Sequence, residues 1–262
     1  MGRVRLRGGW VTLMRAIACL GSSSTAAHGI YDWIDDVAKR QGNESWRFGR
    51  FAAGGDLAYN GLQRAGQIVA SSPDDVIVLL GANDVLASVF PRVERFLGGW
   101  KRLPRKPSPE WYRENMLAIV RTLAKGAPVR IALSSIQPIG EDPTDAHPIQ
   151  SEINRCVAEH NAILREVASA ESVTYLPFYE RMQEMVVASP GQAFTRFDFL
   201  PFYRDVLRQY VLRWSNDEIG VRNGWKLHRD GIHLNSRSGR LLADLVDEFL
   251  RAGPRARTVP AT

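Results

Sequence analysis

The run Val76-Ile77-Val78-Leu79-Leu80 is followed at once by Gly81-Ala82-Asn83-Asp84. Five consecutive apolar residues without alternation are typical of a strand covered on both faces, as the strands of parallel sheets are. The glycine then ends the strand, and a polar Asn-Asp pair follows it. The stretch therefore predicts a buried parallel strand with side chains suited to chemistry at its carboxyl end.

Further apolar runs recur along the chain and alternate with helical patterns. We predict strands over residues 15–20, 46–53, 76–80, 129–135 and 173–176, and helices over residues 26–40, 57–70, 111–125 and 151–168. Asn235 or Ser236 is expected to cap a last helix, because both residue types are good N-caps. This alternation predicts an α/β fold, a three-layer doubly wound parallel sheet of about five strands in the flavodoxin-like order 2-1-3-4-5.

The 262 residues are expected to form one domain, because no repeat or linker divides them. We assign residues 15–252 to this domain, 1–14 to an N-terminal tail and 253–262 to a C-terminal tail. Two insertions are expected, an irregular one near residues 90–109 and one near 190–225. The second holds the aromatic residues Phe194, Phe197, Phe199, Phe202, Tyr203 and Tyr210. It forms either a lid or acyl pocket, or a helical excursion packed on the body.

Composition narrows the class of protein. Hydrophobic residues make up 45% and charged residues 24%, which is typical of a globular domain. No apolar run approaches the roughly 18 residues that cross a bilayer. The net charge of +6 is scattered over the chain, so we expect a solvated basic surface and no nucleic-acid partner. The oligomeric state cannot be predicted.

The N-terminus has one feature of a secretory signal, since basic residues precede the fairly apolar residues 10–20. Arg15 interrupts that stretch, however, and cleavage near Ala26 would remove Ser23. We therefore expect a cytoplasmic protein, with secretion left open and either Met1 or Met14 as the native start. Cys19 and Cys156 are expected to be small buried hydrophobes.

Three polar segments follow the first three predicted strands. Ser23 comes after the first strand, Gly55 after the second and Asn83 after the third. In a doubly wound sheet, ligands bind beyond the carboxyl ends of the strands, where the winding reverses. The first and third strands flank that crevice, and the second lies beside the first. We therefore expect the three segments to meet at one end of the sheet.

These residues, with Asp230 and His233, have the chemistry of acyl transfer. A serine such as Ser23 needs an adjacent base to become a nucleophile. The three-residue spacing in a turn lets Asp230 orient His233, whose other nitrogen then takes the serine proton. The N–H groups of Ser23 and Gly55 and the amide of Asn83 are candidate donors to an oxyanion.

Each residue also has a structural interpretation. The serine-rich loop can cap a helix, Gly54-Gly55 can form an ordinary turn, Asn83 can cap a helix, and His233 can be a surface histidine. Four histidines compete for the role of base, namely His28, His147, His160 and His228. No metal-ligand spacing and no dinucleotide or P-loop fingerprint is found, so neither a metal nor a cofactor is expected.

Four sequence blocks in order resemble those of the SGNH hydrolases, also called GDSL esterases/lipases. They are Gly21-Ser22-Ser23-Ser24-Thr25, Gly54-Gly55-Asp56, Gly81-Ala82-Asn83-Asp84 and Asp230-Gly231-Ile232-His233. The resemblance spans roughly residues 15–250. It implies that Ser23 is the nucleophile, that Asp230 and His233 complete the triad, and that Ser23, Gly55 and Asn83 form the oxyanion hole. Ser22 replaces the usual Asp, and the second block lacks the Asn that often precedes its glycine, so Gly54 remains an alternative to Gly55.

The resemblance implies a serine esterase or acyl hydrolase that needs no cofactor. Its substrate is expected to be a small-molecule, lipid or carbohydrate ester, with the acyl chain and alcohol unspecified. Two alternatives remain open. One is a non-catalytic domain that binds an anion or another ligand at the N-terminus of a helix. The other is an acyltransferase that uses the same site.

Overall fold

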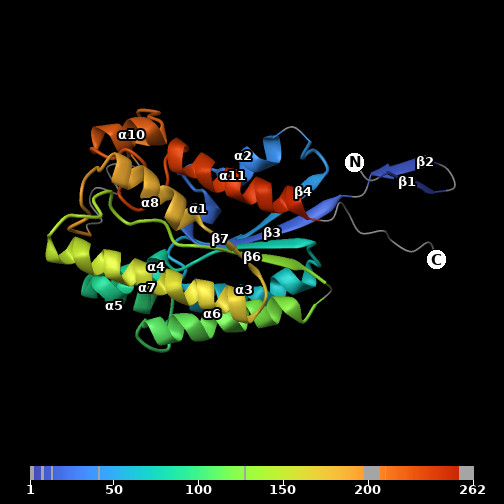
Figure 1. Ribbon diagram of the computed structural model, residues 1–262, viewed down its shortest axis with the longest axis horizontal. Helices are drawn as coiled ribbons and strands as arrows, with labels where there is room; N and C mark the ends of the chain where they lie inside the picture. The colour runs from blue at the N-terminus through green and yellow to red at the C-terminus, as the bar shows by residue number, and fades with distance from the viewer. Residues whose placement is uncertain are drawn as a thin grey trace.

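The computed structural model describes residues 3–6, 9–12, 14–40, 42–126, 128–197, 207–209 and 211–253. Its centre is a five-stranded parallel sheet (Figure 1). The strands are β3 (Arg15–Gly21), β4 (Trp46–Ala52), β5 (Asp75–Leu79), β6 (Arg130–Ser134) and β7 (Thr174–Leu176). Their order across the sheet is β4-β3-β5-β6-β7, which confirms the predicted order 2-1-3-4-5.

Helices cover both faces of the sheet, as Figure 1 shows. One face carries α3 (Ala58–Ala70), α4 (Ala82–Val89), α5 (Pro91–Trp100), α6 (Pro109–Ala124) and α7 (Pro148–Ala170). The other face carries α2 (Trp33–Lys39), α8 (Phe178–Ala188) and α11 (Ser236–Ala252). The predicted three-layer α/β architecture is therefore confirmed.

The packing of β5 explains why polar and apolar residues do not alternate in its sequence. Val76 and Val78 pack into the core on the α3–α7 side, whereas Ile77 and Leu79 pack into the core on the α2–α11 side. All five residues of the strand are buried. Because both faces of this central strand meet helices, its residues 76–79 are all apolar, without alternation.

A buried ionic cluster joins three strands at their amino ends. Asp75, which is fully buried, contacts the guanidinium of Arg15 at 2.5 Å and that of Arg130 at 2.6 Å. Each of the three is the first residue of its strand. Arg15 also donates to the carbonyl of Leu250 in the last helix, at 2.6 Å. Arg15, which interrupts the apolar N-terminal stretch, therefore stabilises the amino ends of the strands, opposite the end where the site is predicted.

The prediction of one helix over residues 26–40 was wrong in its first half. A short helix α1 (Ser23–Ala26) ends at Ala27, whose φ of 57° is left-handed. Helix α2 starts only at Trp33, where the side chain of Asp32 accepts a hydrogen bond from the N–H of Asp35. A side-chain cap of this kind stabilises the start of a helix, so α2 begins there.

The prediction of an irregular segment near residues 90–109 was wrong for its first half, whereas residues 101–108 contain neither helix nor strand, as predicted. Residues 91–100 form α5, in which Pro91 takes the first helical position and Val93 and Leu97 are buried four residues apart. Proline is tolerated at that position because its missing N–H has no partner there anyway. Helix α8, which covers the sheet, was not predicted.

The N-terminal segment and the second insertion contain regular structure whose bounds were not predicted. Residues 3–6 and 9–12 form the antiparallel strands β1 (Arg3–Leu6) and β2 (Gly9–Thr12). Within the second insertion, residues 191–197 have no regular structure and α10 spans Asn216–Arg222. Phe199, Phe202, Tyr203 and Tyr210 lie outside the described residues, as do residues 254–262. None of the helices described is both long and apolar enough to cross a membrane.

Candidate active site

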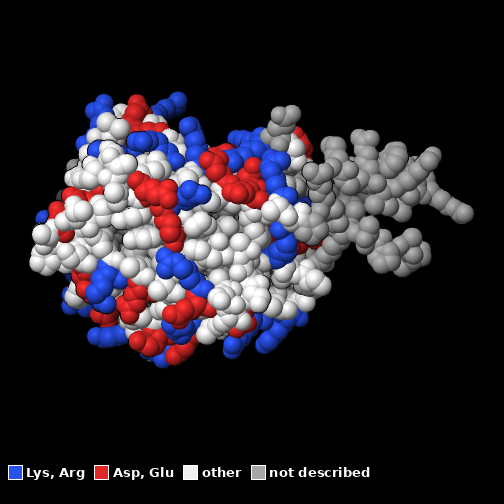
Figure 2. Space-filling model, viewed as in Figure 1, with Lys and Arg blue, Asp and Glu red and all other residues white. Residues whose placement is uncertain are grey.

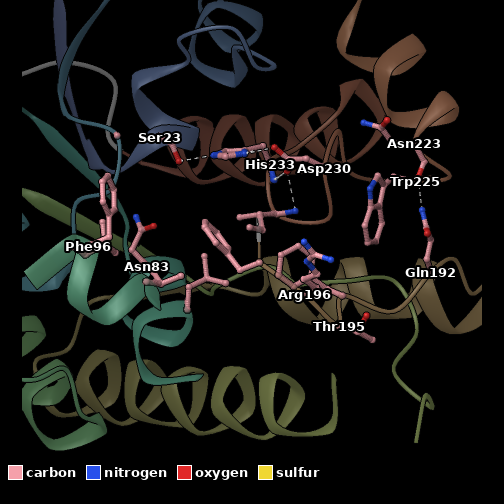
Figure 3. Close-up of a pocket in the computed structure, with 18 of the residues that line it drawn as sticks. Ser23, Asn83, Phe96, Gln192, Thr195, Arg196, Asn223, Trp225, Asp230 and His233 are labelled. Carbon is pink, nitrogen blue, oxygen red and sulfur yellow. Dashed lines mark hydrogen bonds and ion pairs between the residues drawn. The ribbon is translucent and has the colours of Figure 1, made fainter. Parts of the chain in front are cut away.

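Ser23, His233 and Asp230 form a continuous hydrogen-bonded chain (Figure 3). The Oγ of Ser23 lies 2.9 Å from Nε2 of His233. The Nδ1 of His233 lies 2.7 Å from Oδ2 of Asp230. Because an ionised carboxylate only accepts hydrogen bonds, Nδ1 carries the hydrogen, and Nε2 of a neutral ring is left to accept from the serine.

The end of β3 places Ser23 at the cleft. The strand ends at Gly21, Ser22 is the N-cap, and Ser23 is the first residue of α1. A first helical residue has no intrahelical partner for its N–H, which is therefore free to bind another acceptor. Ser22 makes no side-chain capping bond, so the structural alternative of a side-chain cap is not found at this position.

Asp230 and His233 lie on a short loop that a β-bridge between His228 and Leu234 closes. Asp230 Oδ1 accepts from the N–H groups of Ile232 at 3.1 Å and His233 at 2.8 Å, so the loop folds around its carboxylate. The side chain of Asp230 is 19% exposed and that of His233 is 16% exposed. The pair is thus shielded but still reaches the cleft.

The pKa of Asp230 reflects this environment. Burial opposes its ionisation, but the charge of His233 and the hydrogen bonds from the His233 ring and backbone outweigh burial and hold the pKa well below its usual range. Asp230 is therefore ionised at neutral pH. A carboxylate in this position orients the imidazole and stabilises its charged form.

Asn83 lies in the first turn of α4 with its side chain toward the cleft (Figure 3). Its Nδ2 donates to the carbonyl of Asp56 at 2.9 Å, which fixes the amide and leaves its second hydrogen available. The N-cap of α4 is Gly81, so Asn83 is not the helix cap. Gly81 has a φ of +126°, and a Cβ there would lie 2.8 Å from the Tyr112 hydroxyl, so a glycine is required.

The structure distinguishes the two glycines of the second block. Gly55 has a left-handed φ of +74°, and a Cβ there would overlap the ring of Trp100. A Cβ on Gly54 would contact nothing within 4 Å. Both glycines line the cleft. The conformation and close packing at Gly55 therefore require glycine, whereas neither restricts Gly54.

Sequence reasoning missed a buried carboxylate that supports the Asp230–His233 loop. Glu141 accepts from the N–H groups of Lys226 at 2.8 Å, Leu227 at 2.7 Å and His228 at 2.8 Å, and from Nδ1 of His228 at 2.9 Å. The other ring nitrogen of His228 contacts the carbonyl of Pro138 at 3.0 Å. The acid precedes the loop by some 90 residues, so only its place after the fourth predicted strand could have suggested it.

Other residues of the segment that follows β6 also form hydrogen bonds to the Asp230–His233 loop. Gln137 donates to the carbonyl of Ile232 at 3.0 Å, and the N–H of Gly140 donates to Gly231 at 2.8 Å. Burial alone would raise the pKa of Glu141, but the hydrogen bond and charge of His228 and the backbone N–H groups lower it. The Asp230–His233 loop is therefore fixed through a buried, ionised carboxylate.

The candidate residues open into one cleft of about 920 Å³. Ser23, Gly55, Asn83, Asp230 and His233 all line it. In Figure 3, Phe96 and Asn83 lie on one side of the Ser23–His233 pair, and Trp225, Gln192 and Asn223 lie at the far end. An apolar wall comes from α4 and α5, namely Leu86, Val93, Phe96, Leu97 and Trp100.

The competing histidines lie elsewhere. His28 is in an exposed loop, His147 is the N-cap of α7, and His160 is buried against Tyr112 with a pKa lowered by burial. Cys19 and Cys156 are free and buried, as predicted. Within the described ranges, no group of three His, Cys, Asp or Glu side chains is arranged to hold a metal ion.

The sequence pattern of the GDSL-like Lipase/Acylhydrolase family matches residues 19–241. This range runs from β3 into α11 and includes all five candidate site residues. Among curated proteins, none matches the sequence significantly.

Several solved structures share the fold. The lipase/acylhydrolase from Enterococcus faecalis is 17% identical, with a TM-score of 0.59 over 93% of this chain and 100% of that one. The acetylxylan esterase Axe2 from Geobacillus stearothermophilus is 13% identical, with a TM-score of 0.62 over 92% of this chain and 95% of that one. At such identities the likeness establishes the fold alone.

Proposed function

This chain belongs to the GDSL-like lipase/acylhydrolase family and hydrolyses ester bonds, and we propose that it does so through an acyl-enzyme formed on Ser23. The observation that carries the proposal is the 2.9 Å contact between Oγ of Ser23 and Nε2 of His233. This distance lies within the range in which a base takes a proton from a nucleophile.

In the first half of the reaction, Oγ of Ser23 forms a bond to the ester carbonyl carbon while Nε2 of His233 takes the hydroxyl proton. Asp230 stabilises the imidazolium through Nδ1 and stays ionised. The tetrahedral intermediate collapses when its bond to the alcohol oxygen breaks, and His233 gives its proton to the leaving alcohol. The acyl group then remains on Ser23.

In the second half, water attacks the acyl carbon and His233 takes a proton from it. The bond to Oγ of Ser23 breaks, the carboxylic acid leaves, and His233 returns the proton to the serine. In both halves the N–H groups of Ser23 and Gly55 and the free amide hydrogen of Asn83 stabilise the oxyanion. Preorganised donors of this kind contribute because they need no reorganisation when charge develops.

The shape of the cleft favours esters with an apolar acyl group. Phe96, Leu97 and Trp100 form an apolar wall within the same cleft as Ser23 and Asn83. Burial of each methylene of a chain contributes roughly 0.8 kcal/mol. We expect kcat/KM for p-nitrophenyl esters to rise from acetate to longer chains. A highest rate on acetate, or on acetylated sugars, would reject this preference.

A fluorophosphonate probe tests the nucleophile directly. We expect one covalent adduct on Ser23 in the wild-type protein and none in Ser23→Ala, which should also lose nearly all esterase activity while remaining folded. Ser24→Ala is the matched control, because Ser24 is the next residue of α1 and does not line the cleft. Labelling of Ser23→Ala, or half the wild-type rate, would reject the assignment.

The same probe addresses the binding-domain alternative, which predicts no adduct at all. Transfer to an added alcohol, measured against hydrolysis, addresses the acyltransferase alternative. Among the described residues of the cleft, no contact favours either alternative over hydrolysis, so the esterase mechanism remains our proposal.

A further inference from the structure

Helix α5 exposes two large aromatic side chains at the rim of the cleft. Phe96 is 46% exposed and Trp100 is 56% exposed, although both also line the cleft. Their ring centroids lie 5.4 Å apart. Lys101 holds Trp100 in place, because its Nζ lies 4.0 Å from the ring centroid and 2.8 Å from the buried carboxylate of Asp56. The aromatic pair is therefore a fixed feature of the surface.

Basic side chains lie beside these rings. Arg92 is exposed one turn before Phe96, on the same face of the helix, and Arg95 is exposed next to that face. Arg102 is exposed just after the helix ends. Within the described part of the chain, none of these three arginines has an ion-pair partner.

Several exposed arginines elsewhere pair with nearby carboxylates. Arg155 pairs with Glu152 at 2.7 Å, Arg165 with Glu180 at 2.6 Å, and Arg251 with Asp247 at 2.9 Å. Figure 2 shows basic and acidic side chains interspersed over the face it presents. The arginines of α5 differ because they adjoin exposed aromatic rings and lack such carboxylate partners among the described residues.

A second group of exposed apolar residues occurs near the cleft in the chain. Leu207, Val211, Leu212 and Val221 are each more than half exposed. Leu207 and Val221 adjoin Arg208 and Arg222 in sequence, and these two arginines line the cleft. Helices α5 and α10 lie at the same end of the sheet in Figure 1.

We propose that this rim docks the open cleft onto an anionic lipid surface. Aromatic rings with exposed edges lie favourably at the boundary between headgroups and acyl chains, and arginines beside them bind the anionic headgroups. Delivery of a lipid ester from that surface to Ser23 rests on the proposed function, whereas the docking itself does not.

Flotation with vesicles tests the docking without turnover. The probe protein is Ser23→Ala, mixed with vesicles of pure phosphatidylcholine or pure phosphatidylglycerol at physiological salt. We expect binding to the anionic vesicles, little binding to the zwitterionic ones, and loss of binding in high salt. Failure of esterase activity in the wild-type protein would leave this result unchanged, so the two proposals fail separately.

Charge removal identifies the surface. Arg92→Gln/Arg95→Gln in the same Ser23→Ala background should bind phosphatidylglycerol vesicles about 30-fold more weakly, since each arginine near an anionic surface contributes about 1 kcal/mol. Arg47→Gln/Arg181→Gln, with the same change of charge on β4 and α8, is the control and should bind as Ser23→Ala does. Phe96→Ser/Trp100→Ser should also weaken binding.

Three results with vesicles would overturn the proposal. They are absence of binding to phosphatidylglycerol vesicles, an equal loss in the control variant, and full binding by Arg92→Gln/Arg95→Gln. Retention of the protein on insoluble xylan without vesicle binding would also overturn it, because the aromatic pair would then be a carbohydrate platform. With Ser23 restored, Arg92→Gln/Arg95→Gln should hydrolyse a soluble ester at the wild-type rate, which shows that the fold is intact.

Discussion

Nε2 of His233 lies 2.9 Å from Oγ of Ser23, although 210 positions separate the two residues in the chain. Ser23 is the first residue of α1, just after β3, and His233 lies on a loop before the last helix. The contact exists because β3 lies inside the sheet, between β4 and β5, and because the segment after β6 anchors the Asp230–His233 loop. The predictions that follow test how the surrounding residues maintain this geometry.

Asn83→Ala should lower kcat by about 10²–10³-fold with little change in KM, because an oxyanion donor acts mainly in the transition state. Steady-state kinetics on a soluble p-nitrophenyl ester measures both constants. Asn60→Ala is the control. The side chain of Asn60 also forms a hydrogen bond near the start of a helix, where it accepts from the N–H of Leu57 at 3.1 Å. Asn60 does not line the cleft. A change confined to KM in Asn83→Ala would contradict the oxyanion role.

Gly55→Ala and Gly54→Ala form a matched pair that identifies the glycine of the second block. At Gly55 the left-handed φ and the overlap with Trp100 should together destabilise the protein by roughly 2–4 kcal/mol. The rate should also fall, because the Gly55 N–H would shift. Gly54→Ala meets open space and should change the free energy of unfolding by less than about 0.5 kcal/mol. Equal effects of the two variants on rate and stability would reject the choice of Gly55.

Glu141→Gln should lower both stability and kcat. The substitution leaves the buried ring of His228 without its carboxylate, which typically costs about 3–5 kcal/mol. The rate should fall because Glu141 anchors the chain at residues 226–228, just before the Asp230–His233 loop. Urea unfolding and kinetics at a temperature where the variant is folded measure the two effects.

Asp75→Asn is the control for Glu141→Gln, because it breaks a buried ionic cluster at the opposite edge of the sheet. Asp75→Asn should destabilise the protein but leave kcat unchanged.

The pH dependence of the free energy of unfolding gives a second readout for Glu141→Gln. Interactions in the folded protein lower the pKa of Glu141. The ionised carboxylate therefore stabilises the folded protein at any pH above the pKa that Glu141 has in the unfolded chain. This stabilisation is lost as the pH falls through the pKa that Glu141 has in the folded protein. Stability of Glu141→Gln should therefore decline less in acid.

Asp84→Asn should alter the dependence of stability on pH in the opposite sense. Burial raises the pKa of Asp84 to about 7, against the opposing hydrogen bond from the N–H of Ala58. Between the unfolded pKa and about 7, the folded state holds a proton that the unfolded state has released, so stability falls as pH rises. Asparagine does not titrate and keeps an oxygen acceptor for Ala58.

We compare the free energy of unfolding of the wild type with that of Asp84→Asn at each pH. The wild-type value minus the variant value should fall by up to about 1.4 kcal/mol for each unit by which the pH rises. The fall should begin near the unfolded pKa and stop above about pH 7. Urea unfolding of both proteins across this range measures it. A constant difference would show that Asp84 does not hold its proton in the folded state.

Several elements were predictable because their signals are local. The run Val76–Leu80 lacks alternation because both faces of β5 are covered, and Asn235 caps α11 by accepting from the N–H groups of Arg237 and Ser238. The start of α2 was not predictable from apolar spacing alone. Its limits depend on the left-handed Ala27 and on the cap at Asp32, which compete with a continuous helix.

Strand and helix periodicity is a property of neighbouring residues, so the amino-acid sequence was enough to predict the succession of strands and helices along the chain and the strand ends that Ser23, Gly55 and Asn83 follow. The packing of distant segments brings His233 to Ser23, anchors the His233 loop through Glu141, and places Phe96 and Trp100 beside the cleft. Those contacts join distant segments, and their distances follow from how the helices pack on the sheet. No local pattern encodes such packing.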